Sequence, residues 1–167
     1  MPVRIVAFVA KSNTGKTSLL EKVIKELKNR GYKVGAIKHD AHRFDIDHPG
    51  KDSHRLTEAG ADTMLITSLD RLALIKKHVV APSLEELMTT YFADVDIVLT
   101  EGFKMSTLPK IEVHRKERSS TLLCRGELHD PLLVAVASDE TLNLDVPVLD
   151  LNNIDEVTNF IERTFLQ

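Results

Sequence analysis

Residues 9–18, VAKSNTGKTS, carry the strongest chemical signal in the sequence. A phosphate-binding loop follows G-x-x-x-x-G-K-[ST]: backbone N–H groups surround a phosphate, the lysine neutralises its charge, and the last hydroxyl ligates Mg²⁺. Gly15, Lys16 and Thr17 complete this pattern, whereas Ala10 stands in place of the first glycine. Alanine fits if its position needs no positive φ. The residues predicted to bind the nucleotide are Ser12, Asn13, Thr14, Gly15, Lys16, Thr17 and Ser18.

Two residues at the ends of other apolar runs fit the same chemistry. Glu101 follows VDIVLT, and a carboxylate at the carboxyl end of a neighbouring parallel strand usually reaches Mg²⁺ or its water. A solvated acid at a strand end is the alternative. Lys38 ends a second apolar run and is expected to act on the transferred phosphate. Glu101 and Lys38 are therefore predicted to be catalytic, and Thr17 and Glu101 to ligate Mg²⁺.

The segment 38–54, KHDAHRFDIDHPGKDSH, holds four histidines and four aspartates. We favour a mobile switch loop in which Asp47, or alternatively Asp45, is linked to Mg²⁺. An ordinary solvated loop is the second interpretation. A second metal site is the third, because the histidine spacing fits no regular metal motif. The histidines concerned are His39, His42, His48 and His54.

Two more positions are candidates for nucleotide contacts. Asp139 ends the late apolar run AVAS, and a carboxylate there can accept hydrogen bonds from guanine N1–H and N2–H, with Ala137 and Ser138 letting the backbone approach the base. An ordinary strand-end aspartate is an equal alternative. Lys11 lies where some dimeric P-loop ATPases carry a lysine that reaches the partner's nucleotide, although a solvated lysine is the more common case.

The elements that position these residues follow from apolar periodicity. The order of strand, glycine-containing loop, helix and strand over residues 3–39 favours a parallel βαβ unit and an α/β, P-loop NTPase-like fold, with a mostly parallel sheet and helices on both faces. The predicted strands are 3–10, 33–39, 95–102, 110–115, 132–139 and 147–151. The predicted helices are 16–31, 51–60, 83–92 and 154–165. Residues 103–130 show no clear period.

Two segments suggest contact with a second subunit. The apolar runs 63–68 and 71–78 predict a hairpin added to the parallel core. At a sheet edge they would expose backbone groups and apolar side chains, which pairing with another copy would cover. The alternative is that a helix of the same chain covers this edge. The charged strand KIEVHR, 110–115, is expected to be poorly suited to the centre of a monomer and to contribute to the same interface.

Length and composition set the outer limits. With 167 residues, 43% hydrophobic and 28% charged, the chain fits one domain over residues 1–167. A net charge of −3 disfavours nucleic acid as a partner. No apolar run approaches the length of a membrane span, so no membrane contact is expected. The single cysteine, Cys124, fits a reducing, cytoplasmic location.

Four stretches together resemble the molybdopterin-guanine dinucleotide biosynthesis protein B (MobB) family. They are AKSNTGKT at 10–17, IKHDAHRFDIDHPGKDS at 37–53, TEGFK at 100–104 and VAVASDETLNLDVPVLDLN at 134–152. The resemblance implies a GTP-binding, weakly hydrolysing homodimer, and Mg²⁺ is expected with the nucleotide because of the predicted ligands Thr17 and Glu101. It also implies an adapter that assists the nucleotidyltransferase joining GMP to molybdopterin and meets other cofactor-assembly proteins, with molybdopterin as a further ligand.

Other functions stay open on sequence grounds. A more distant, fold-level similarity to dethiobiotin synthetase supports Glu101 and Lys38 by analogy. One alternative is an ATP-dependent small-molecule kinase or ligase. Another is a metal-delivering GTPase that uses the histidines of segment 38–54.

Overall fold

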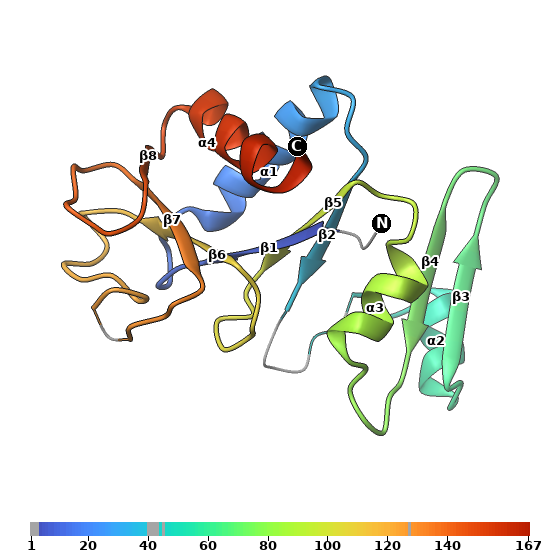
Figure 1. Cartoon of the computed structure of the whole chain (residues 1–167). Coiled ribbons are helices and arrows are strands. Elements are labelled where there is room, and N and C mark those ends of the chain that lie inside the picture. Colours follow the sequence, from blue (N-terminus) through green and yellow to red (C-terminus); the bar gives the residue numbers. More distant parts are fainter. Residues whose placement is uncertain (1–3, 40–43, 45, 127) are drawn as a thin grey trace. The chain divides into compact units, whose positions relative to one another are not determined.

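The computed structural model describes residues 4–39, 44, 46–126 and 128–167 (Figure 1). The chain forms two compact units, one of Met1–His39 with Met88–Gln167 and one of Asp40–Leu87. That the whole chain acts as one nucleotide-binding domain stays a prediction.

The larger unit is built on a six-stranded sheet with the order β2-β5-β1-β6-β7-β8. Every neighbouring pair is parallel, which confirms the predicted α/β fold. Because parallel strands need crossovers, the neighbours in space are distant in sequence. The strands are β1 (Arg4–Val9), β2 (Val34–Lys38), β5 (Ile97–Glu101), β6 (Lys110–His114), β7 (Leu133–Ser138) and β8 (Val148–Asp150).

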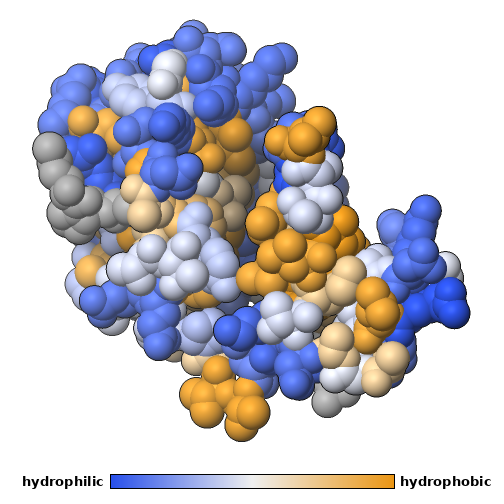
Figure 2. Space-filling model, turned by 90° about the vertical axis from the view of Figure 1, so that its right-hand side faces the viewer, coloured by the Kyte–Doolittle hydropathy of each residue, from blue (hydrophilic) through white to orange (hydrophobic). Residues whose placement is uncertain are grey.

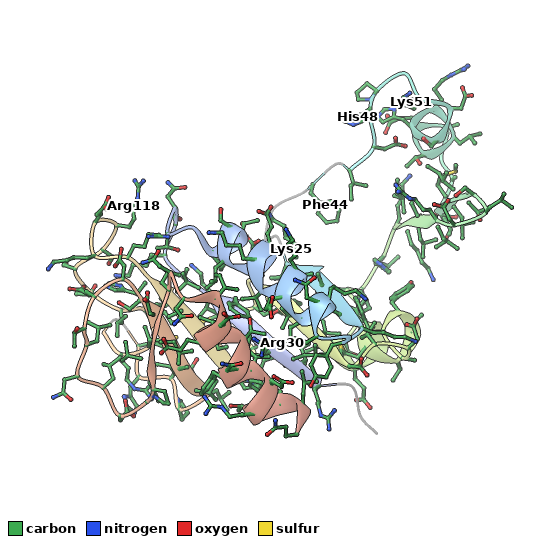
Figure 3. All side chains as sticks on the ribbon, turned by 90° about the horizontal axis from the view of Figure 1, so that it is seen from above. Lys25, Arg30, Phe44, His48, Lys51 and Arg118 are labelled. Atoms are coloured by element: carbon green, nitrogen blue, oxygen red, sulfur yellow. The ribbon has the colours of Figure 1, made fainter. Side chains whose placement is uncertain are left out.

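Two helices cover one face of this sheet (Figure 1). Helix α1 (Lys16–Asn29) packs on the sheet through Leu19, Leu20, Val23 and Leu27, all of which are buried. Helix α4 (Ile154–Ile161) is followed by a π-helical turn, Glu162–Leu166. Asn153 caps the first turn of α4 by accepting a hydrogen bond from the N–H of Glu156. The guanidinium of Arg30 joins the two helices, with hydrogen bonds to Asn159 and Glu162 (Figure 3).

Strand β6 carries polar side chains onto the face of the sheet opposite these helices, and its position corrects the expectation for it. Instead of lying at an interface, Lys110–His114 is entirely buried between β1 and β7. Its apolar side chains, Ile111 and Val113, join the helical core, while its polar side chains alternate onto the other face.

Each polar side chain of β6 is tolerated there because it has a partner. Lys110 pairs with Asp130 at 2.9 Å, and its ammonium also donates to the carbonyl of Ser106. The carboxylate of Glu112 accepts from the backbone N–H groups of residues 123 and 124, and His114 contacts Glu140 at 2.9 Å. A charged strand therefore fits the centre of the monomer once its charges are neutralised within the chain.

The smaller unit contains α2 (Asp52–Glu58) and an antiparallel hairpin of β3 (Thr63–Thr67) and β4 (Leu72–Lys76). The predicted hairpin is confirmed, but its two strands form a sheet of their own rather than an addition to the parallel sheet. Helix α3 (Leu84–Tyr91) crosses the boundary between the units and starts at a reciprocal cap, in which Ser83 and Glu86 bond each other's backbone N–H.

Apolar side chains lie exposed on the hairpin and on the segment that follows it (Figure 2). Leu72 is 65% exposed, and Leu69, at the turn, is fully exposed. The other exposed apolar side chains here are Leu65, Ile66, Val79 and Val80.

Candidate functional site

The predicted phosphate-binding loop lies between β1 and α1. Gly15 has a φ of 82° and immediately precedes the first helical residue, Lys16, so a β-carbon at position 15 would be strained. Among the described residues, the non-glycine residues with a positive φ are Asn13 and Phe103. Ala10 is therefore free of the conformation that would demand glycine, and it is buried in the core. This explains how alanine replaces the first glycine of the motif.

The loop lines a cavity of about 760 Å³ in the larger unit. All seven predicted loop residues, 12–18, contribute to it, together with Glu101 from the end of β5. Lys11, Lys104 and Arg118 add three cationic side chains. A concave site with several cations and one carboxylate suits a polyanionic ligand accompanied by a metal cation.

Glu101 is the centre of the site. Its Oε2 accepts a 2.9 Å hydrogen bond from the hydroxyl of Thr17, and its Oε1 lies 3.7 Å from Nζ of Lys16 and 3.9 Å from Nζ of Lys38. Residues from three separate elements, β2, β5 and the start of α1, thus meet as predicted. Burial lowers the pKa of the Lys16 ammonium, with help from Lys104 and Lys38, although Glu101 opposes the shift.

The chain beyond Glu101 turns through two left-handed residues, Gly102 with φ 106° and Phe103 with φ 57°. A β-carbon at Gly102 would lie 2.9 Å from the carbonyl oxygen of His39, which excludes other residues. The ring of Phe103 stacks on that of His39 with centroids 4.5 Å apart. Lys38 and Glu101 are opposite each other in the pairing of β2 with β5, and the stacked rings continue this contact just beyond the ends of the two strands.

Sequence reasoning missed Arg115, which follows β6. Its Nε donates a 2.9 Å hydrogen bond to the carbonyl oxygen of Thr14, and its guanidinium lies 3.4 Å from where a β-carbon of Gly15 would be. Arg115 therefore holds the phosphate-binding loop from outside. Arg115 directly follows β6, and β6 lies next to β1 in the sheet. This position could have indicated a contact with the loop after β1, but the strand order cannot be read from the sequence.

Asp139 stands at the end of β7, as expected, but it does not line the phosphate cavity. Its carboxylate accepts from the N–H of Lys116 at 2.9 Å and pairs with Arg115 at 3.5 Å. With Ser138 it borders a separate cavity of about 460 Å³ at the ends of β7 and β8. Guanine recognition by Asp139 stays a prediction.

The predicted metal ligand Asp47 belongs to the smaller unit, whereas all the residues that line the cavity belong to the larger one, so its link to Mg²⁺ stays a prediction. A hydrogen bond from Ser53 and the N–H of His48 lower the pKa of its carboxyl. Asp45 and His42 lie outside the described residues. Among those described, no three His, Cys, Asp or Glu side chains form a metal-binding group. Lys11 donates to the hydroxyl of Thr121 in the same chain.

A parallel sheet whose first strand leads through such a loop into a helix defines a P-loop-like, nucleotide-binding class of protein. The chain belongs to the family described as Molybdopterin guanine dinucleotide synthesis protein B, whose model matches residues 5–139. Among the described residues, no helix has both the length and the apolar character needed to cross a membrane.

Two relatives are similar to this protein in sequence over nearly the whole chain. The molybdopterin-guanine dinucleotide biosynthesis adapter protein of Escherichia coli is 39% identical, over 95% of this chain and 91% of that protein. The adapter protein of the same name from Haemophilus influenzae is 37% identical, over 96% and 89%. A crystal structure of molybdopterin-guanine biosynthesis protein B covers 98% of this chain and 99% of its own, with a TM-score of 0.76 and 25% identity.

Proposed function

We propose that the protein is a GTP-binding adapter in the synthesis of molybdopterin guanine dinucleotide. The observation that carries the proposal is the convergence of Lys16, Thr17 and Glu101 on one cavity in a chain of this family. The relatives' names supply the pathway, and the cavity supplies the ligand class, since its cations suit a nucleoside triphosphate.

In this proposal, each residue has a separate task. Lys16 and the N–H groups at the start of α1 bind the phosphates. Thr17 and Glu101 hold Mg²⁺, which neutralises charge on the phosphate oxygens when it is bound. The donor set fits that ion because a hydroxyl and a carboxylate already lie 2.9 Å apart. Its distance of 3.9 Å from Glu101 supports a role for Lys38 at the terminal phosphate.

The adapter role concerns what the nucleotide is used for. We propose a slow GTPase whose partners are the nucleotidyltransferase and other cofactor-assembly proteins, with molybdopterin as a further ligand, in the cytoplasm. The exposed apolar side chains of β3, β4 and the following residues support assembly into a homodimer, because such surface is costly in water.

Titration of GTP and ATP with Mg²⁺, against wild type and Lys16→Ala, tests the proposal. We expect GTP to bind more tightly than ATP, and Lys16→Ala to weaken GTP binding by about 2 kcal/mol, because a partly buried charge-assisted contact is lost. Equal affinity of the two proteins for GTP would contradict the proposed site. Preference for ATP with a turnover of about 10 per second would favour the kinase alternative.

Two further measurements address assembly. Light scattering at micromolar concentration is expected to give twice the monomer mass of 18.7 kDa. A pull-down with the nucleotidyltransferase, with and without GTP and Mg²⁺, is expected to recover more partner when the nucleotide is present. A monomer that captures no cofactor-assembly protein in either condition would contradict the adapter role.

A further inference from the structure

The cations of the phosphate cavity differ in how far they are already engaged. Lys16 faces Glu101 at 3.7 Å, and Lys11 donates to the hydroxyl of Thr121. Arg118 also lines the cavity, but in the part of the chain that the structure describes no carboxylate forms an ion pair with it. Its guanidinium is thus available to an anionic ligand. Figure 3 shows Arg118 beside the end of α1 at which the phosphate-binding loop lies.

Arg118 comes from a turn whose backbone is fixed. The N–H groups of Arg118 and Ser119 both donate to the carbonyl of Arg115, at 3.0 and 3.2 Å. The hydroxyl of Ser119 then donates to the carbonyl of Thr121 and accepts from its N–H. The path of residues 115–121 is therefore set by hydrogen bonds within the turn, which limits how far Arg118 can move from the cavity.

The same turn is tied to the phosphate-binding loop and to β7. The side chain of Arg115 donates to the carbonyl of Thr14 and pairs with Asp139, while the N–H of Lys116 donates to Asp139. The side chain of Arg115 thus contacts the phosphate-binding loop. Its backbone carbonyl accepts the hydrogen bonds of the turn that carries Arg118. This geometry sets the position of Arg118 relative to Gly15.

We propose that Arg118 is a phosphate-binding residue, presented in cis to a nucleoside triphosphate by the positioning residue Arg115. The proposal rests on the proposed nucleotide-binding function and adds a contact that lies outside the phosphate-binding motif. A planar guanidinium with paired N–H donors matches the oxygens of a phosphate and can engage two of them at once. Arg118 would contact the phosphates from the turn that follows β6, whereas Lys16 contacts them from the first turn of α1.

The test compares Arg118→Ala with a matched control, Lys116→Ala. Both remove one positive charge from the same turn, but Lys116 is 75% exposed and does not line the cavity. Titration with GTP and Mg²⁺ is expected to show about a tenfold loss of affinity for Arg118→Ala, the size of one charge-assisted contact. Lys116→Ala is expected to change affinity less than about twofold, as an exposed charge outside the site should. Thermal unfolding without nucleotide should be the same for both variants.

The role of Arg115 is tested by a double-mutant cycle with Arg115→Ala, Arg118→Ala and the double variant. If Arg115 presents Arg118, the second substitution costs less GTP affinity once Arg115 is absent, so the two losses are less than additive. Additive losses would overturn that role.

Equal affinities of Arg118→Ala and Lys116→Ala, in a protein whose GTP binding still depends on Lys16, would overturn the phosphate contact alone. If wild type and Lys16→Ala bind GTP equally, the proposed function and this inference both fall.

Discussion

The hydroxyl of Thr17 donates a 2.9 Å hydrogen bond to Oε2 of Glu101, so the two predicted Mg²⁺ ligands are in direct contact across 84 positions of sequence. The contact joins the first turn of α1 to the carboxyl end of β5. If Mg²⁺ were bound by both residues, the hydroxyl would keep its proton but turn a lone pair toward the ion, and this hydrogen bond would be lost. Because the two oxygens already lie together, the proposed site would need rotation of the hydroxyl rather than a shift of α1 or β5.

Thr17→Ala is expected to weaken GTP binding mainly when Mg²⁺ is present. Without the metal, the hydroxyl supplies at most one ordinary hydrogen bond, worth about 1 kcal/mol. With the metal, loss of a ligand adds to that cost, so the difference from wild type should grow. Calorimetric titrations in Mg²⁺ and in chelator measure both values. A loss of the same size in the two conditions would argue against Thr17 as a metal ligand.

Glu101→Gln is expected to lower hydrolysis more than binding. The substitution keeps the shape of the side chain but removes the charge that faces Lys16, Lys38 and the predicted metal. We expect kcat to fall by at least about tenfold more than GTP affinity, because the metal's role is greatest in the transition state. Single-turnover phosphate release, paired with GTP titration, separates the two effects. Parallel losses in both measurements would assign Glu101 to binding alone.

Asp139→Asn tests whether this side chain reads the base. Asparagine retains an oxygen that can accept from the N–H of Lys116, so the local fold should survive. If Asp139 accepts from guanine N1–H and N2–H, the variant should bind GTP less well and xanthosine triphosphate better, since an amide N–H can donate to the xanthine oxygen. If Asp139 acts only through Arg115, the two nucleotides should be affected alike.

Asp130→Asn is expected to destabilise the protein by about 3 kcal/mol at pH 7, because it leaves the buried ammonium of Lys110 without its carboxylate. Burial raises the pKa of the Asp130 carboxyl, but hydrogen bonds from the N–H of Leu132 and from Lys110 outweigh it and hold the pKa below its usual range. A lowered folded-state pKa contributes stability above the unfolded value, near 3.9, and loses it as pH falls through the folded value.

Urea unfolding of wild type and Asp130→Asn between pH 7 and pH 3 measures this pH dependence. The difference in unfolding free energy should be largest at neutral pH and should shrink below about pH 4. A difference that stays constant over this range would mean that the ion pair does not contribute. Asp130→Asn combined with Lys110→Met serves as the control, and it should recover part of the lost stability.

Cys124 is expected to be unreactive in the folded protein. Burial, followed by the nearby carboxylates of Glu112 and Asp130, raises the pKa of its thiol to about 12. At pH 8 only about one thiol in ten thousand would be ionised, and the thiolate is the reactive form. Labelling with a thiol reagent should therefore be slow in buffer and fast in urea. Rapid labelling of the native protein would show that the segment around Cys124, which bonds Glu112 of β6, opens readily.

The part of the site that sequence predicted well depends on local pattern and on one topological rule. Residues 12–17 follow a motif with a fixed spacing, and Glu101 follows from the convergence of parallel strands at their carboxyl ends. The first prediction uses only the sequence of one strand, loop and helix. The second uses only the rule that parallel strands end at the same edge, and neither uses the detailed order of the strands.

What the sequence did not predict depends on pairing between distant segments. The predicted strand 110–115 was expected at an interface because of its charges. The carboxylates that pair with Lys110 and His114 are Asp130 and Glu140, which lie 20 and 26 positions further along the chain and carry no periodic signal. The hydrogen bond from Arg115 to the carbonyl of Thr14 was missed for the same reason, because 101 positions separate the two residues. The hairpin was predicted from two apolar runs, 63–68 and 71–78, but no local feature showed that its strands would form a sheet of their own.

The strand order also determines when the phosphate-binding loop can be held in place as the chain is synthesised. Among the described strands, β1 pairs with β5 and β6 alone. Arg4 is opposite Ile97 of β5 and Val9 is opposite Glu112 of β6. Until those segments have left the ribosome, β1 has no neighbouring strand and Lys16 has no Glu101 beside it. The intervening hairpin, by contrast, pairs entirely within residues 63–76 and can form as soon as it emerges. The part of the sequence that is translated almost first is therefore completed late.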